Sequence, residues 1–318
     1  MSIGASAVRG NHEDRVLAAA YGLKKLDYWP QQQQEEDESV ESSGNKDRDR
    51  QKEHQKDEHA KSVAKSLSKS QLKWLAERPV ILTVGQLGHQ PPQVSEQKHH
   101  KHKGGKGKKK KKEGEEGEQG PQQPWNTQNE VVVVHGGLVP GVELEKQDPW
   151  AVMNMRSLIY APSYNRDGEE EEEEVPVPVD STDDGEPWSK AWNRHQNHLP
   201  PSTSDDTPSQ KKTIVIYGHD ARRGLQVDPQ VDITPYFEKQ KGSNNKKGSH
   251  KKPKKEKGTR YAFGLDSGCG HGKKLTAMVI IIPKEEEGDD IEGEGEIIKH
   301  EIVQVDCNDV STGKDSKE

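Results

Sequence analysis

The stretch VVVVHGG, residues 131–137, indicates the fold class, because it joins an apolar strand to a histidine and two glycines. Four consecutive valines are typical of a strand that is buried on both faces. The stretch TIVIYGH, residues 213–219, repeats the pattern of a strand followed by glycine and histidine. Ligand sites in α/β sheets gather at such strand ends. The two stretches therefore predict an α/β domain with His135 and His219 at the rim of its sheet.

A third histidine lies near the start of the chain, in GNHED, residues 10–14, just ahead of a helix expected over residues 13–26. Each residue also has a plainer explanation. Asn11 could be the helix N-cap, and Glu13 and Asp14 could complement the helix dipole. A lone histidine near a strand end is more often a hydrogen-bonded surface or core residue than a ligand. The order GNHED, then HGG, then GHD is what indicates a metal site for phosphate chemistry.

The composition limits how much of the chain can pack into one core, because only 27% of its 318 residues are hydrophobic and 32% are charged. We expect one globular domain over residues 1–306 and a disordered tail over 307–318. Five charged inserts that lack an apolar period are expected to interrupt the domain, at about 31–59, 90–124, 165–185, 240–258 and 284–296.

The segments between the inserts predict an alternation of helices and strands. A helix over residues 60–77 would bury one face, which holds Val63, Leu67, Trp74 and Leu75. The other expected elements are buried strands at 80–84, 131–134, 213–217 and 261–265, and the two arms of a hairpin at 275–282 and 297–305.

Two cysteines, Cys269 and Cys307, stand outside any CxxC motif, which argues against a disulfide framework and a structural zinc finger. We expect free thiols in a reducing compartment. No apolar run reaches the roughly 18 residues that a membrane span needs, and no signal-peptide core follows Met1. The chain as given is expected to be cytoplasmic, with the vacuole as the alternative if a targeting segment lies upstream.

Three blocks of sequence, together with GNHED, resemble a known family. They are VVVVHGGLVPGVELEKQDPWAVMNMRSL at 131–158, TIVIYGHDARRGL at 213–225 and YAFGLDSGCGHGKKLTAMVI at 261–280. The chain resembles the calcineurin-like metallophosphoesterases. Within them it is most similar to the fungal zinc-dependent endopolyphosphatases, which are related to the bacterial symmetrical dinucleoside tetraphosphatases. The resemblance covers none of the charged inserts.

The resemblance implies a two-sheet sandwich flanked by helices, with two metal ions (Zn, Mn, Co or Fe) bridged by an aspartate and a hydroxide. Carried over by position, Asn11, His135 and His219 would ligate one metal. His12 would lie beside the phosphoryl group as proton donor or charge stabiliser. Three arginines could bind further phosphates, although solvated surface charge is at least as good an explanation for them: Arg156, Arg222 and Arg223.

The family also carries an Asp-x-His motif and a Gly-Asp…Arg-Gly segment ahead of GNHED. Here the residues before Gly10 are MSIGASAVR, which contain neither Asp nor His. We therefore expect an N-terminally incomplete domain, through a mis-assigned start or a truncated gene model. The chain as given would then hydrolyse phosphoesters slowly or not at all.

The function expected from the resemblance is hydrolysis of phosphoanhydride or phosphoester bonds, with polyphosphate or dinucleoside polyphosphate as substrate. Serine/threonine protein phosphatase activity is one alternative. Another is a non-catalytic protein that binds polyanions through KHHKHKGGKGKKKKK, residues 98–112, by counterion release. A pseudoenzyme that has kept the fold is the third. The sequence does not predict the oligomeric state.

Overall fold

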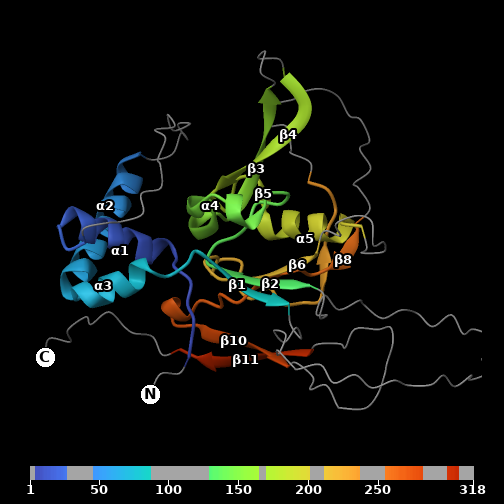
Figure 1. Ribbon diagram of the computed structural model, residues 1–318. Helices are drawn as coiled ribbons and strands as arrows, with labels where there is room; N and C mark the ends of the chain where they lie inside the picture. Colours follow the sequence, from blue (N-terminus) through green and yellow to red (C-terminus); the bar gives the residue numbers. More distant parts are fainter. Residues whose placement is uncertain are drawn as a thin grey trace, which may run out of the picture.

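The structure, a computed structural model, describes residues 4–26, 46–86, 129–164, 170–200, 211–236, 255–281 and 299–307. It is a mixed α/β protein whose centre is a four-stranded sheet in the order β1-β2-β6-β9 (Figure 1). Its strands are β1 (Ile81–Gln86), β2 (Glu130–Val134), β6 (Thr213–Tyr217) and β9 (Ala262–Gly264). β1 is antiparallel to β2, whereas β2, β6 and β9 run parallel. The carboxyl ends of β2 and β6 therefore meet at one edge of the sheet.

Two layers cover this sheet (Figure 1). On one side lie α4 (Pro149–Asn154) and α5 (Trp188–His198), and Trp188 and Trp192 of α5 are buried in the main core. On the other side lies an antiparallel hairpin of β10 (Lys274–Ile281) and β11 (Lys299–Asp306), of which Met278 and Ile280 pack against the same core. Short β-sheets complete this part: β3 (Ser157–Tyr164) with β4 (Glu170–Val179) and β5 (Glu186–Pro187), and β7 (Gln230–Asp232) with β8 (Lys257–Thr259).

Three helices form a separate group beside the sheet (Figure 1): α1 (Asn11–Gly22), α2 (Lys46–Ser66) and α3 (Lys69–Ala76). They enclose a small core of their own, made of Val16, Ala20, Ala60, Ala64 and Leu72. Alanines at the contact let the helix axes approach closely, because they bring little volume between the backbones. The group holds the start of α1 next to the rim of the central sheet.

The helix predicted over residues 60–77 is interrupted. α2 ends at Ser66, and α3 begins after Ser68, whose side-chain oxygen accepts a hydrogen bond from the Gln71 backbone N–H. This N-cap starts a new helix. As a result Trp74, which we expected to be buried, is 52% exposed, and the Arg78 guanidinium lies 4.6 Å from its ring centre.

Three of the predicted inserts are partly wrong. α2 begins at Lys46, inside the segment 31–59, because Lys, Arg, Gln and Glu favour helix even without an apolar period. β4 lies inside the segment 165–185, where its backbone pairs with β3. β8 begins at Lys257, within the segment 240–258. The predicted inserts 90–124 and 284–296 lie outside the described residues.

The two cysteines are bonded to each other, so the expectation of free thiols is wrong. Cys269 and Cys307 form a disulfide, and the Cys307 N–H also donates to the Lys273 carbonyl. Sequence spacing could not show this, because residues 38 apart meet only once β11 has paired along β10. Residue 307 therefore belongs to the folded hairpin and not to the predicted tail. No helix among the described residues is long and apolar enough to cross a membrane.

The predicted strands at 80–84, 131–134, 213–217 and 261–265 and the predicted hairpin are confirmed, with shifts of a few residues at their ends. The helix predicted over 13–26 is confirmed as α1, which starts at Asn11 and ends at Gly22. The two-sheet sandwich that the resemblance implies stays a prediction.

Candidate functional site

Three side chains from distant parts of the chain meet at the rim of the central sheet. Nε2 of His135 lies 3.0 Å from Oδ1 of Asn11 and 3.1 Å from Nδ1 of His219. These are the three residues that the resemblance carried over as ligands of one metal. The structure thus brings together one amide oxygen and two imidazole nitrogens, with His135 as the central member.

Two parallel strands and one helix start position these side chains. His135 follows β2 directly, and His219 follows β6 after one glycine. Since β2 and β6 are neighbours in parallel register, both imidazoles reach the same edge. The N-cap of α1 is Gly10, so Asn11 is the first helical residue and not the cap. A Cβ at Gly10 would lie 2.6 Å from the His135 ring, so only glycine permits this close approach.

His219 is held in an unusual backbone conformation. Its φ is 66°, and the Asp220 N–H donates to the Gly218 carbonyl at 2.7 Å. A hydrogen bond across three residues with positive φ at the centre is typical of the strained form of the γ-turn. Such strain persists only where the surroundings enforce it, and it gathers at functional sites.

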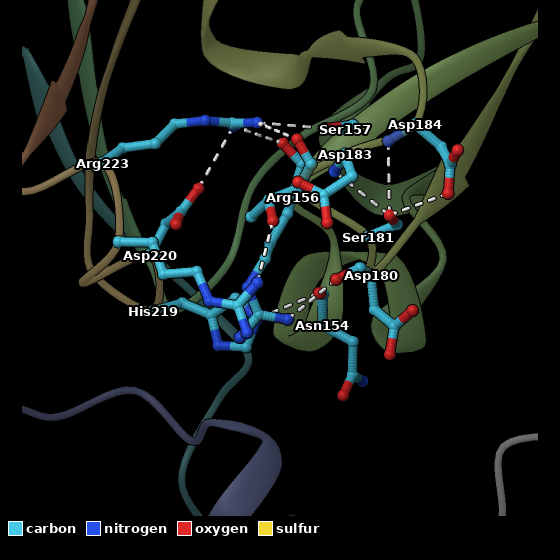
Figure 2. A network of polar contacts seen from close by, with 12 residues as sticks. Asn154, Arg156, Ser157, Asp180, Ser181, Asp183, Asp184, His219, Asp220 and Arg223 are labelled. Carbon is cyan, nitrogen blue, oxygen red and sulfur yellow. Dashed lines mark hydrogen bonds and ion pairs between the residues drawn. The ribbon is translucent and has the colours of Figure 1, made fainter. Parts of the chain in front are cut away.

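The surroundings that enforce this turn are centred on Arg223 (Figure 2). Its guanidinium pairs with the buried Asp220 carboxylate at 3.1 Å and donates to the Arg156 carbonyl at 2.9 Å and to Oγ of Ser157 at 3.2 Å. It also donates to the Thr182 carbonyl. Arg223 therefore joins the turn after β6 to the start of β3, and both terminal nitrogens of its guanidinium already have partners within the chain.

The ring of His219 is fixed from its far side. Its Nε2 lies 3.0 Å from the Asn154 carbonyl oxygen at the end of α4 (Figure 2). A carbonyl can only accept, so Nε2 carries the hydrogen and Nδ1 presents its lone pair to His135. A metal-binding histidine commonly donates its second ring N–H to a carbonyl in this way.

Burial disfavours the charged form of both imidazoles. It lowers the pKa of His219 to about 3, with smaller effects from the charges of Arg156 and His135. Burial also lowers the pKa of His135, and the charge of nearby Glu13 opposes this. Neutral imidazole is the form that binds metal, so this environment favours a ligand role at neutral pH.

The remaining predicted residues differ in what surrounds them. His12 is exposed, and Glu13 accepts a hydrogen bond from the Gly10 N–H at 3.0 Å, as a helix-capping residue does. Arg222 donates to Oγ1 of Thr182, and Arg156 donates to the Asp180 carbonyl at 2.9 Å. Of the three arginines, Arg156 is the one whose charge acts on His219.

Sequence reasoning missed two members of this region. Asp266 follows β9, the third parallel strand, and its charge acts on His135. The pattern of a strand followed by a polar residue, in YAFGLD, could have found it. The other is the backbone carbonyl of Asn154, for which a sequence carries no signal.

The spacing of the donor atoms of Asn11, His135 and His219 is close to that of ligands around one cation. Ligand atoms around a cation with bonds of about 2.1 Å are separated by about 3.0 to 3.4 Å, close to the distances within this group. Among the described residues, no group of three or more His, Cys, Asp and Glu side chains is placed to hold a metal ion. The group at the rim consists of two imidazoles, from His135 and His219, and the amide of Asn11.

Comparisons with known proteins add little to the description of the site. No protein-family model matches the chain, and no curated protein sequence matches it. One solved structure, that of a provisionally assigned diadenosine tetraphosphatase, is similar with 19% sequence identity and a TM-score of 0.38. The match covers 86% of this chain and 63% of that chain, so this chain spans less than two thirds of that structure. A likeness at this level establishes neither the fold nor the function of this chain.

Proposed function

We propose that the chain carries a metal-dependent hydrolase site of the metallophosphoesterase type, within the corresponding two-sheet fold. Its substrates would be phosphoanhydrides or phosphoesters, in the class of polyphosphate or dinucleoside polyphosphates. The observation that supports the proposal is the convergence of Asn11, His135 and His219 at one rim of a parallel sheet. Nitrogen and oxygen donors of this kind suit Zn²⁺ or Mn²⁺.

When bound, a divalent cation would polarise the phosphoryl group and lower the pKa of a coordinated water. The chain's own residues would orient the ligands, donate a proton and bind the phosphate. Asn154 would orient His219 by accepting the Nε2–H, and Gly10 would leave room for the His135 ring. His12 would donate a proton to the leaving oxygen, which an imidazole can do near neutral pH. Arg156 would bind a phosphoryl oxygen with the donors that Asp180 does not use.

The test is a Zn²⁺ and Mn²⁺ titration by calorimetry, followed by hydrolysis assays with 4-nitrophenyl phosphate and tripolyphosphate. His135→Ala and His219→Ala should each lower metal affinity at least about 100-fold, because a lost ligand costs more than a lost second-sphere contact. His271→Ala, which removes an exposed imidazole elsewhere, should leave the affinity unchanged. Unchanged affinity in His135→Ala would overturn the proposal.

Histidines of the basic tract could bind metal adventitiously and hide this effect. The parent for all variants should therefore carry alanine in place of His99, His100 and His102. The proposal that residues 98–112 bind polyanions falls outside the described residues. The same parent, with and without that tract, tests it by polyphosphate binding against salt.

A further inference from the structure

A cavity of about 690 Å³ lies among the three helices, and His12, the residue after Asn11, is one of its lining residues. Its walls are apolar where α1, α2 and α3 approach one another, with Val16, Ala60, Val63 and Leu75 among the lining residues. A volume of this size and an apolar wall are typical of sites that bind small organic molecules. The function proposed above makes no use of this space.

The polar residues that line the cavity are mostly basic, which suits a ligand that carries a phosphate next to its organic group. Arg15, Lys56, His12 and His59 bring basic side chains, and Glu13 is the acidic one among the lining residues. The Glu13 carboxylate already accepts a hydrogen bond from the Gly10 N–H, at the start of α1. Arg15 also pairs with Asp57 at 3.4 Å on the exposed side of α2. The N-terminal end of α1 adds a positive dipole end.

His12 lies between the cavity and the proposed metal ligands Asn11, His135 and His219 in the chain's contacts. It lines the cavity, and it follows Asn11, whose side-chain oxygen contacts His135. Its charge also acts on both His135 and His219, which places it within electrostatic range of the two imidazoles. A ligand that reaches past His12 from the cavity would therefore approach Asn11, His135 and His219.

We propose that this cavity binds the organic group of a phosphate ester, preferably an aromatic one, while the phosphoryl group lies at Asn11, His135 and His219. This inference rests on the function proposed above and narrows its substrate class. Val63 and Leu75 offer surface that an aromatic ring can cover and that an inorganic phosphate chain cannot. The cavity would therefore give an aromatic phosphate ester apolar contacts that inorganic polyphosphate cannot make.

The experiment fills the cavity and compares two substrates. Val63→Phe places a ring into the space from α2, and Ser62→Phe places the same ring one residue earlier, on the exposed face of that helix. For both variants and the parent, the KM values for 1-naphthyl phosphate and tripolyphosphate are measured with the metal present. Binding of 1-naphthol to the metal-free proteins is measured by fluorescence, and circular dichroism checks the fold.

We expect Val63→Phe to raise the KM for 1-naphthyl phosphate at least about tenfold and to weaken 1-naphthol binding by a similar factor. The KM for tripolyphosphate should stay within about twofold, and Ser62→Phe should behave like the parent. Equal changes for both substrates, or no change for 1-naphthyl phosphate, would overturn the inference. If the parent hydrolyses neither substrate, the proposed function fails, whereas 1-naphthol binding still decides whether the cavity accepts an aromatic group.

Discussion

Nδ1 of His219 lies 3.1 Å from Nε2 of His135, although the two residues are 84 positions apart in the chain. Because His219 donates its Nε2–H to Asn154, its Nδ1 can only accept, and the hydrogen between the rings belongs to Nε2 of His135. A cation bound between these atoms needs both lone pairs. His135 must then move its hydrogen to Nδ1, so the tautomer of His135 reports whether the site is loaded.

This tautomer change is the first prediction. In the metal-free protein at pH 7, nitrogen NMR of labelled histidine should show His135 protonated on Nε2 and His219 also on Nε2. Saturation with Zn²⁺ should move the His135 hydrogen to Nδ1 and leave the tautomer of His219 unchanged. If His135 keeps its Nε2–H at saturating Zn²⁺, it is not a metal ligand.

The second prediction concerns the γ-turn. Arg223→Met removes the guanidinium that ties Asp220 to the start of β3, so His219 should lose its fixed position. We expect metal affinity to fall by about 10- to 100-fold, as for other losses of a group that orients a ligand. Arg222→Met is the matched control, because Arg222 is the neighbouring residue and makes one exposed contact to Thr182. Equal effects of the two variants would show that the loss of a positive charge, and not the position of His219, changes the metal affinity.

A third prediction follows from the disulfide. Replacement of Cys269 and Cys307 by serine should lower the free energy of unfolding by about 2 to 4 kcal/mol, because the bond closes a long loop. Urea unfolding measures the loss of stability. Amide hydrogen exchange should become faster first in β10 and β11. Reduction of the parent with dithiothreitol should give the same result. A reduced protein with unchanged stability would contradict the prediction.

The fourth prediction is a fall in stability with acid. Burial lowers the pKa of four histidines, so each binds protons less readily in the folded protein than in the unfolded chain: His135, His219, His195 and His300. Below about pH 6.5 the unfolded state binds more protons than the folded state. The contribution of these histidines to the free energy of unfolding is therefore fully present above that pH and is lost as the pH falls. For His219 the loss continues down to about pH 3.

Urea unfolding of the metal-free protein at pH 7.5, 6.5 and 5.5 checks this dependence. Each such histidine contributes a slope of up to about 1.4 kcal/mol per pH unit. His219→Gln should reduce the slope between pH 6.5 and 5.5, since a neutral side chain binds no proton. The same slope in this variant and in the parent would rule out His219 as a source of the effect.

The sequence predicts the parts of the site that depend on buried strands. The runs of β-branched residues in β2 and β6 indicate where His135 and His219 leave the sheet, and parallel pairing then brings the two rings together. It could not predict the γ-turn or the Asn154 contact, since both depend on backbone conformation and on a carbonyl that any residue would supply. It also missed most of α2, whose charged residues favour helix without an apolar stripe.

The hairpin of β10 and β11 has a consequence for protein engineering. At the end where the chain connects the two strands, Ile281 pairs directly with Lys299, and near the other end Cys269 and Cys307 are covalently joined. Any chain between residues 281 and 299 thus starts and finishes at two fixed neighbouring points. Doubling the length of such a connection costs only about 0.6 kcal/mol. A fluorescent protein or an affinity tag could be inserted there while His135 and His219, which follow other strands, keep their positions.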